Sequence, residues 1–581
     1  MKKHITGYPS IDKPWLNYYT DKMINTPIPE CSIYEFLYNN NKAYPQQIAI
    51  NYFGREITFA ELFKNIETTT AALIELGVRE GDIVTVGLPS IPEALYLVYA
   101  LNRIGAVSNM IHPLAGEQEL AFYLNEVKSR FAFLFDATYR IVVPSLDKTS
   151  VTRSVIITAG ESLPMGLKQM FFLKNKKIPL HDEAKTIRWQ DFLKMSKGVK
   201  VPEYKKDPNT MALISHTGGT TGEPKGVMCS DNNINYEIMQ MGLMLDMRRQ
   251  ETQMAVLPPF VNYSLINSML EPLGLGQKCV LIPKYEPDKF FEYAKKYRPN
   301  IIATIPPYLE AMLTAKERHN ADLSFIRLSA YGGEAMDPQN EAAVNELYKQ
   351  CKVANKLGKG IGMTELMGAS TFTMPGYDMG ENSLGIPLQH SNCKIIDTET
   401  HKELGYNQEG EICFAGPCVM LGYYHNKQAT DDLVRVHDDG VRWIHTGDLG
   451  KLDENGRLYI TGRIKRIIMT KGKDGVVTKL FPDRIEKVVN THPAVSLSCV
   501  ISVPDEVRVN YPKAYVELKP HVSGTEQLSD EIKKYCHNFL PGYMIPEEVE
   551  FIDELPRTSR GKVDFRALEK LRDETASKTT S

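Results

Sequence analysis

The sequence predicts an α/β protein with a large amino-terminal domain, made of mostly parallel sheets flanked by helices plus a small β-rich subdomain, and a small α+β carboxyl-terminal domain. The 581-residue length exceeds that of one ordinary domain. Over the first 460 residues, short β-branched runs alternate with amphipathic stretches, a pattern that indicates parallel sheets covered by helices on both faces. Hydrophobic residues make up 43% and charged residues 24%, which is typical of a globular enzyme.

The alternation can be followed along the chain. A strand is expected at 82–88 and a helix at 92–103. Further strands are expected at 107–111, 131–135, 154–158, 280–283 and 301–305. The most apolar long window, 91–111, contains Glu93 and Arg103, so it is too polar to span a bilayer and is expected to be a buried helix followed by a strand.

The domain boundaries follow from changes in this pattern. Short strands with Gly/Pro turns at 409–424 indicate the β-rich subdomain. A basic stretch opens at Gly462-Arg-Ile-Lys-Arg466, and helix and strand patterns follow it, at 484–490, 514–518 and 531–538. The remaining length suits one small α+β domain. We therefore expect an amino-terminal domain over 1–461, a hinge at 462–466 and a carboxyl-terminal domain over 467–581.

Composition excludes several classes of protein. The net charge of −3 comes from acidic and basic residues mixed along the chain, which argues against a nucleic-acid partner. Nine cysteines are scattered and never spaced as Cys-x-x-Cys, so neither a disulfide framework nor a structural zinc site is expected, and a reducing cytoplasm fits best. The amino terminus has two lysines with no apolar core behind them, unlike a signal peptide.

The segment 163–177 combines Met, Leu and Phe with lysines. Such a segment could lie on a membrane surface or near an apolar substrate entrance. The alternative is a helix packed against its own domain with its lysines in water, and the sequence alone favours that alternative.

The most informative run is His216-Thr-Gly-Gly-Thr-Thr-Gly-Glu-Pro-Lys-Gly226. Glycines let backbone N–H groups turn toward an anion, while hydroxyls and Lys225 add donors and charge. It is not a Walker A loop, because Ser or Thr does not follow Lys225. The run predicts a phosphate-binding loop formed by Thr217, Gly218, Gly219, Thr220, Thr221, Gly222 and Lys225.

This loop resembles the phosphate-binding signature of the adenylate-forming superfamily, which includes acyl- and aryl-CoA synthetases, carrier-protein adenylation domains and beetle luciferases. Further patches match the superfamily in order, over roughly residues 45 to 568. Early ones lie at 74–82 and 103–107. Leu257-Pro-Pro-Phe-Val-Asn-Tyr263 resembles a Pro-x-Phe-His stretch whose last residue gates the carboxylate pocket. Val261 takes the gate position here, and Phe260 and Tyr263 are candidate pocket walls or a buried aromatic corner.

A second pair of patches implies roles at the nucleotide. Gly360-Ile-Gly-Met-Thr-Glu365 is similar to the family's Tyr-Gly-x-Thr-Glu. The resemblance implies that Thr364 contacts the α-phosphate and Glu365 holds Mg²⁺, which as a hard cation prefers carboxylate and phosphate oxygens. Ile361 replaces the adenine-stacking Tyr. Gly333 and Glu334 are assigned to the adenine and ribose region, and the implied acyl pocket adds Gly332, Gly358 and Gly360.

The last patches lie beyond residue 440. In His445-Thr-Gly-Asp448 the family's aspartate accepts hydrogen bonds from both ribose hydroxyls, and Arg463 would lie near the ribose or phosphates. The resemblance places the hinge at Lys465, about which the small domain moves. Leu555-Pro-Arg-Thr-Ser-Arg-Gly-Lys562 ends in the family's catalytic lysine, which bridges carboxylate and phosphate during adenylation.

The resemblance implies an ATP-dependent acid–thiol ligase that uses ATP, Mg²⁺ and coenzyme A. A carboxylate would attack the α-phosphate, giving acyl-AMP and pyrophosphate, and a thiol would then take the acyl group. Gly475-Val-Val-Thr-Lys-Leu-Phe-Pro482 departs from the family pattern near the thiol acceptor. The small residues of the pocket favour a medium- or long-chain fatty acid, with an aryl acid next. A stand-alone adenylation enzyme that loads a carrier protein and a catalytically dead nucleotide-binding protein remain as alternatives.

Overall fold

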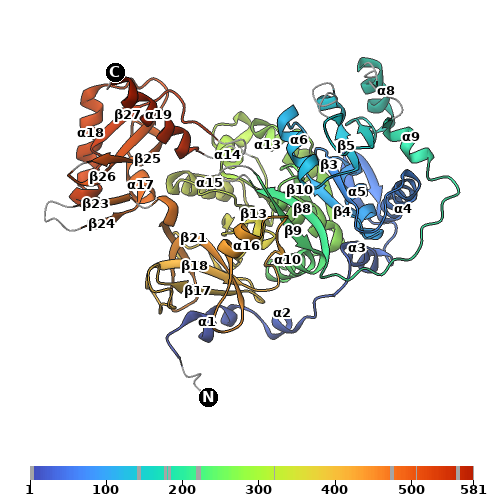
Figure 1. Ribbon diagram of the computed structural model, residues 1–581, viewed down its shortest axis with the longest axis horizontal. Helices are drawn as coiled ribbons and strands as arrows, with labels where there is room; N and C mark the ends of the chain where they lie inside the picture. The colour runs from blue at the N-terminus through green and yellow to red at the C-terminus, as the bar shows by residue number, and fades with distance from the viewer. Residues whose placement is uncertain are drawn as a thin grey trace. The chain divides into compact units, whose positions relative to one another are not determined.

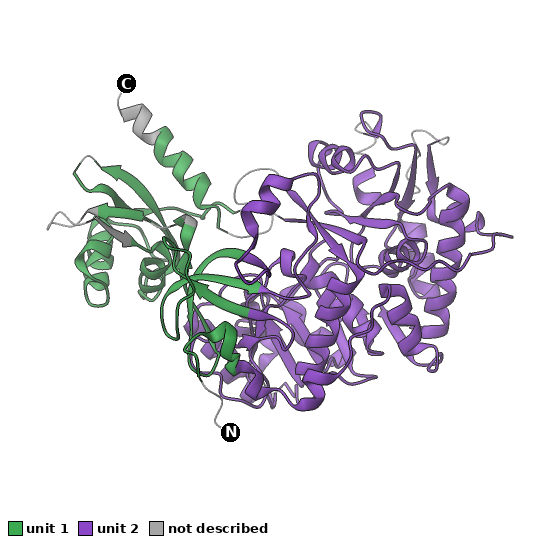
Figure 2. Ribbon diagram, turned by 60° about the horizontal axis from the view of Figure 1, so that its bottom comes forward, with its two compact units in different colours: residues 1–14, 393–414, 445–581 green, residues 15–392, 415–444 purple. Residues whose placement is uncertain are grey.

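The computed structural model describes residues 5–139, 146–175, 180, 185–217, 224–319, 321–466, 468–471, 477–505, 507–557 and 563–579 (Figure 1). The chain divides into two compact units (Figure 2). The large unit comprises residues 15–392 and 415–444, and the carboxyl-terminal unit comprises residues 1–14, 393–414 and 445–581. The hinge at 462–466 and the domain limits drawn from the sequence stay predictions.

A seven-stranded sheet forms one layer of the large unit. All its neighbouring strands are parallel except the last pair, in which β1 and β2 form an antiparallel hairpin. Its spatial order is β14 (Gly358–Lys359), β13 (Leu328–Tyr331), β12 (Ile301–Thr304), β10 (Thr252–Ala255), β11 (Lys278–Leu281), β1 (Ile48–Tyr52) and β2 (Arg55–Thr58). Strands β10, β12 and β13 are buried along their whole length, as expected when helices cover both faces.

An eight-stranded sheet forms the second layer of the large unit. Neighbouring strands are parallel from β8 to β7 in its spatial order. At the other edge, the pairs β19–β9 and β9–β8 are antiparallel. Its spatial order is β19 (Gly422–Tyr423), β9 (Lys225–Ser230), β8 (Met211–Thr217), β4 (Val107–Met110), β3 (Ile83–Gly87), β5 (Phe131–Phe135), β6 (Arg153–Ile157) and β7 (Thr186–Arg188). The prediction of mostly parallel sheets is confirmed.

The helices of the large unit begin and end at recognisable signals. Thr58 caps α4 by accepting a hydrogen bond from the Glu61 N–H, and Gly77 at φ 103° ends that helix. Pro92 occupies the first turn of α5, where its missing N–H costs nothing. The longer helices are α3 (Ile33–Asn41), α4 (Phe59–Leu76), α5 (Pro92–Arg103), α6 (Glu117–Glu126), α8 (Met165–Lys174), α10 (Asp231–Met244), α13 (Phe290–Tyr297) and α15 (Pro338–Gln350).

Short helical turns complete the large unit. They are α2 (Asp21–Asn25), α9 (Trp189–Lys194), α11 (Asn262–Ser264), α12 (Glu271–Gly274), α14 (Pro306–Glu310) and α16 (Lys427–Leu433), with a π-helical turn η2 (Leu265–Leu270) between α11 and α12. A two-stranded ribbon lies outside the main sheets, where β15 (Thr371–Phe372) pairs with β16 (Ile386–Pro387). Strand β20 (Val434–Val436) pairs with Arg442–Ile444, the start of the longer strand β21 (Arg442–Leu452).

The carboxyl-terminal unit combines a β-rich part with an α+β part, and the segment 409–424, predicted to form the β-rich subdomain, is divided between the two units after residue 414. The first part contains α1 (Pro9–Asp12), β17 (Asn392–Ile396), β18 (Gly410–Ala415), most of β21 (Arg442–Leu452) and β22 (Leu458–Arg463). The second part holds a ribbon and a three-stranded sheet packed with helices: β23 (Ile468–Lys471), β24 (Val477–Leu480), α17 (Pro482–Val489), β25 (Val495–Asp505), β26 (Val509–Leu518), α18 (Glu526–His537), β27 (Glu548–Phe551) and α19 (Phe565–Thr579).

Sequence periodicity located the early elements closely. The expected helix at 92–103 coincides with α5, and the strands expected at 131–135 and 82–88 are β5 and β3. The apolar window at 91–111 is a buried helix followed by β4. Within the described residues, no helix has both the length and the apolar character needed to cross a membrane.

Candidate functional site

The two ends of the predicted phosphate loop lie on the paired strands β8 and β9. Thr217 and Lys225 are paired residues, the last of β8 and the first of β9. The residues between them include Gly218, Gly219, Thr220, Thr221 and Gly222, which lie outside the described residues. The hairpin therefore positions the two ends of the run that the sequence predicted to bind phosphates.

Tyr423 links the two charged residues predicted for this site. Its hydroxyl donates a hydrogen bond to Oε1 of Glu365 over 2.5 Å. The ammonium Nζ of Lys225 lies 5.1 Å from the centre of the Tyr423 ring, within the range of a cation–π interaction. Burial and the neighbouring Glu365 raise the pKa of Tyr423 above its usual value, so the phenol stays a neutral donor. Tyr423 thus contacts the Glu365 carboxylate through its hydroxyl and the Lys225 ammonium through its ring.

Asn262 connects three of the sequence patches. Its Oδ1 accepts a hydrogen bond from the Ser215 hydroxyl on β8, two residues before the loop. Its Nδ2 donates to the backbone carbonyl of Thr364 over 3.2 Å. Asn262 is buried, and its neighbours along the chain are the predicted pocket residues Val261 and Tyr263. One amide therefore holds the loop strand, the predicted acid-pocket segment and the Thr364–Glu365 turn together.

The backbone of Glu365 is also held in place by a hydrogen bond. Its carbonyl accepts a hydrogen bond from Met420 N–H over 2.9 Å, and its side chain is buried. Glu365 is the middle residue of the 3₁₀ turn Thr364–Leu366, which is followed by Met367 at φ 67°. A carboxylate whose side chain and backbone are both held by hydrogen bonds is a ligand that suits a hard divalent cation such as Mg²⁺.

The predicted pocket walls lie at the carboxyl end of β10. Phe260 is half-buried, and its ring centre lies 4.5 Å from that of His112. The Tyr263 hydroxyl donates to the carbonyl of Thr304 over 3.4 Å. Val261, the gate position, is half-buried. Aromatic and aliphatic surface is therefore present where the sequence predicted an acyl pocket, and these assignments stay predictions.

The four glycines assigned to the pocket and nucleotide differ in their surroundings. A Cβ at Gly332 would lie 3.6 Å from the Tyr263 ring, an ordinary contact. Gly333 has φ +87°, a conformation that favours glycine. A Cβ at Gly358 would lie 2.7 Å from the ring of Phe372, and one at Gly360 would lie 2.0 Å from the Thr371 carbonyl oxygen. The backbone of Thr371 therefore requires glycine at Gly360, whereas a side chain at Gly358 would require the Phe372 ring to shift.

Ile361 and Glu334 lie on the loops that follow β14 and β13. The Ile361 carbonyl accepts hydrogen bonds from Ser370 N–H over 2.8 Å and from Thr371 N–H over 3.2 Å. These bonds fix the backbone of the Gly360–Glu365 patch. Both side chains are half-buried, and their assignment to adenine and ribose stays a prediction.

Asp448 and Arg463 form an ion pair in the carboxyl-terminal unit. They are directly paired residues of β21 and β22, and Arg463 Nε lies 2.9 Å from Asp448 Oδ1. The Asp448 side chain is 10% exposed and that of Arg463 is 55% exposed. The buried carboxylate is thus held in place while the guanidinium extends into solvent.

Glu411 fixes the turn that carries Asp448. Its Oε2 lies 2.9 Å from Nδ1 of His445, and its Oε1 accepts a hydrogen bond from Gly447 N–H over 3.0 Å. The Thr446 hydroxyl donates to the Ile412 carbonyl over 2.8 Å and accepts from Asp448 N–H over 3.0 Å. The His445–Asp448 segment of β21 is therefore anchored to β18.

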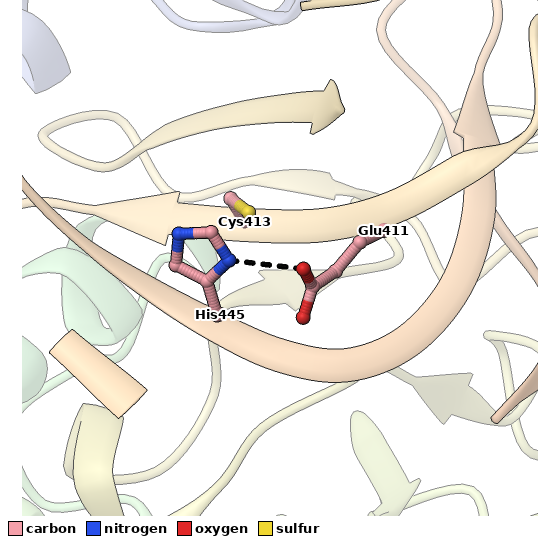
Figure 3. Close-up of side chains that lie close together, drawn as sticks. All are labelled: Glu411, Cys413 and His445. Carbon is pink, nitrogen blue, oxygen red and sulfur yellow. Dashed lines mark hydrogen bonds and ion pairs between the residues drawn. The ribbon is translucent and has the colours of Figure 1, made fainter. Parts of the chain in front are cut away.

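Cys413 lies beside this pair, as Figure 3 shows. Ligand atoms of Glu411, Cys413 and His445 all lie within 4.8 Å of one another, and the three side chains are buried. Spacing along the sequence did not reveal this group, because its members come from two strands. The carboxylate oxygens already bind His445 and Gly447, so we assign the group a structural role.

The predicted hinge residue Lys465 lies in the 3₁₀ turn Ile464–Arg466. The next residue, Arg466, forms ion pairs with Asp483 and Glu486 of α17. It also donates to the Val500 carbonyl over 3.1 Å. The chain is therefore anchored to the α+β part directly after Lys465. Lys562, the predicted catalytic lysine, lies outside the described residues.

Sequence reasoning missed Tyr423, Asn262 and Glu411. Asn262 lies inside the quoted 257–263 patch, but only its neighbours drew attention. Tyr423 and Glu411 lie in the 409–424 segment, whose Gly/Pro turns gave only a structural signal.

Family models match most of the chain. The AMP-binding enzyme model matches residues 37–424, and the model of the AMP-binding enzyme C-terminal domain matches residues 484–562. A long-chain-fatty-acid–CoA ligase of Bacillus subtilis is 29% identical over 567 residues, covering 96% of this chain and 97% of its own. A 4-coumarate–CoA ligase of Humulus lupulus is 28% identical and covers 88% of each chain.

Solved structures share the fold. ATP-bound MatB from Rhodopseudomonas palustris superimposes with a TM-score of 0.80 at 22% identity, covering 94% of this chain and 99% of its own. An anthranilate CoA ligase in complex with anthranoyl-AMP gives a TM-score of 0.80 at 22% identity, covering 96% of this chain and 100% of its own.

Proposed function

The chain belongs to the AMP-binding enzyme family and is an AMP-forming acid–CoA ligase, and we propose that its acid substrate is a medium- or long-chain fatty acid. The observation that best supports an adenylation site here is the position of Tyr423. Its hydroxyl donates a hydrogen bond to Glu365, and its ring faces the ammonium of Lys225. Tyr423 therefore contacts both Glu365, the carboxylate proposed to bind a metal ion, and Lys225, the cation proposed to bind phosphates.

In the first step a carboxylate oxygen of the acid forms a bond to the α-phosphorus of ATP, and the bond between the α-phosphorus and the bridging oxygen breaks. The products are acyl-AMP and pyrophosphate. Such chemistry depends on positioning and on neutralising charge spread over phosphate oxygens. We propose that Thr217 and Lys225 bind phosphates and that Thr364 contacts the α-phosphate. Glu365 would hold Mg²⁺, which would neutralise phosphate charge.

Residues of the carboxyl-terminal unit take further proposed roles. Asp448, an acceptor-only group when ionised, would accept hydrogen bonds from the ribose hydroxyls. Arg463 would add positive charge beside it. Lys562 would bridge the substrate carboxylate and the phosphate. We also propose that a movement about Lys465 withdraws this lysine before the second step.

In the second step the thiolate of coenzyme A attacks the acyl-AMP carbonyl. A carbon–sulfur bond forms, the bond from the acyl carbon to the phosphate oxygen breaks, and AMP leaves. The mixed anhydride formed in the first step supplies the driving force, so no further nucleotide is consumed.

Two observations support an apolar acid. Phe260, Val261 and Tyr263 supply aromatic and aliphatic surface, and such surface suits an apolar acyl group. The Bacillus subtilis relative, which spans nearly the whole chain, is a long-chain-fatty-acid–CoA ligase by name. An aryl acid is the second candidate, favoured by the 4-coumarate–CoA ligases among the relatives and by the paired rings of His112 and Phe260.

The substrate is tested by competition. The full-length protein is given Mg·ATP, coenzyme A and equimolar acids from acetate to palmitate with benzoate and cinnamates, and thioesters are quantified by mass spectrometry. We expect medium- or long-chain acyl-CoA to dominate. A dominant aroyl- or cinnamoyl-CoA would replace the fatty-acid proposal with the aryl one. Transfer only to a phosphopantetheinyl carrier protein, and not to free coenzyme A, would instead identify a carrier-loading enzyme.

A further inference from the structure

An exposed apolar face lies on α8, the helix Met165–Lys174 (Figure 1). No residue of this helix is buried. Met165 is 79% exposed, Met170 66% and Leu173 85%. Large apolar side chains that gather on one surface usually mark an interaction site rather than scatter by chance.

These three side chains share one side of the helix. With about 100° between successive residues, Met165, Leu173 and Met170 fall within an arc of roughly 140°. Phe171 points about 160° away from Leu173 on the same reckoning. The apolar residues on the outer arc are therefore directed away from the side occupied by Phe171.

The opposite side is anchored to the large unit. Phe171 packs on Gly160, where a Cβ would lie 2.3 Å from its ring. Lys168 donates a hydrogen bond from Nζ to the Glu161 carbonyl over 2.6 Å. The helix is therefore fixed on the protein by one side while it presents Met165, Met170 and Leu173 outward. The sequence favoured the alternative that this helix packs against its own domain. Such packing explains the position of Phe171 but not the exposure of Met165, Met170 and Leu173.

The charge of segment 163–177 indicates what kind of surface binds the exposed apolar face of α8. Residues 163–177 contain four lysines and no acidic residue. Within the helix, Lys174 borders the apolar arc and is exposed, whereas the ammonium of Lys168 is bound to the Glu161 carbonyl on the anchored side. A helix with an apolar face bordered by lysines lies in the interface of a bilayer, with its ammonium groups toward anionic headgroups. An apolar protein surface would not require this excess of positive charge.

We propose that α8 docks the protein on an anionic lipid surface, with Met165, Met170 and Leu173 inserted between headgroups and Lys174 beside them. The contact is peripheral and reversible, since one short helix without a lipid chain buries little apolar area. The proposal does not depend on the identity of the acid substrate.

The test is sedimentation of the full-length protein with vesicles of phosphatidylcholine alone and of phosphatidylcholine with about one-third phosphatidylglycerol. We expect binding to the anionic vesicles that weakens with added salt, and little binding to the neutral ones. The double variant Met170→Glu/Leu173→Glu should reduce anionic binding by about tenfold or more. Lys174→Glu should reduce it less.

Val507→Glu is the matched control, because Val507 is 78% exposed in the carboxyl-terminal unit. It should bind vesicles as the unchanged protein does. Circular dichroism melting of each variant distinguishes lost binding from lost folding. The proposal is overturned if the folded protein fails to bind anionic vesicles, or if the double variant binds as well as the control. Dimerisation that Leu173→Glu abolishes, without vesicle binding, would assign the face to a second copy of the chain instead.

Discussion

The hydroxyl of Tyr423 donates a 2.5 Å hydrogen bond to Glu365, and the same ring faces the ammonium of Lys225. Hydrogen bonds to a charged group contribute more than neutral ones because the acceptor carries full charge. Tyr423 therefore positions the carboxylate proposed to hold Mg²⁺ without itself contacting the reacting atoms.

Tyr423→Phe should keep the ring and lose this hydrogen bond. We expect adenylation to fall about tenfold to a hundredfold, the equivalent of roughly 1.5–3 kcal/mol. The Mg²⁺ concentration for half-maximal rate should rise, which a purely structural role would not cause. Tyr424→Phe is the matched control and should leave both quantities unchanged. A Tyr423→Phe enzyme with normal Mg²⁺ dependence would remove the positioning role.

Asn262→Ala should uncouple the Ser215 strand from the Thr364 turn. The lost hydrogen bonds are buried, so we expect the free energy of unfolding to fall by about 1–3 kcal/mol and adenylation to slow. A double-mutant cycle with Ser215→Ala measures the coupling by denaturant unfolding and by initial rate. Strictly additive effects on both would contradict a connection through this amide.

Glu411→Gln should act through Asp448. The neutral amide weakens the bond to His445 and loosens the turn that carries the carboxylate proposed for ribose. We expect KM for ATP to rise several-fold while kcat changes less, because the loss concerns nucleotide binding. Asp448→Ala should raise KM for ATP further. An equal fall of kcat with no change in KM would place Glu411 outside nucleotide binding.

Glu237 gives stability an unusual dependence on pH. It lies on α10, fully buried, and its Oε1 accepts hydrogen bonds from Ala369 N–H over 2.8 Å and Asn267 Nδ2 over 3.1 Å. Desolvation by burial raises the pKa of this carboxyl from 4.5 to about 7. The folded state therefore retains a proton between these two values that the unfolded chain has lost.

The sign follows from linkage. Stability from Glu237 is fully present below the unfolded pKa and is lost as pH rises toward the folded value of about 7. The loss is on the order of a few kcal/mol. Glu237→Gln mimics the protonated form, so this variant should lose less stability than the unchanged protein between pH 5.5 and 8, as measured by urea unfolding. Parallel pH profiles for the two proteins would show that Glu237 is ionised in the folded state.

The sequence predicted the elements whose signals are local. Helix α5 follows from Pro92 and a continuous apolar pattern, and the Thr217–Lys225 run follows from glycine and hydroxyl spacing. The side chains that organise the site were not predictable in this way. Tyr423 reaches Glu365, and Asn262 reaches Ser215, only because the sheets bring distant segments together. Likewise, glycine at Gly360 reflects the Thr371 carbonyl against it, a contact invisible along the chain.

Pyrophosphate–ATP exchange tests adenylation most directly, because isotope enters ATP only if acyl-AMP forms reversibly. We predict exchange that requires both a carboxylic acid and Mg²⁺. Lys562→Ala should nearly abolish it while still making thioester from supplied acyl-AMP and coenzyme A. Absence of acid-dependent exchange across acetate, palmitate and cinnamate, in a protein that binds ATP, would contradict the account.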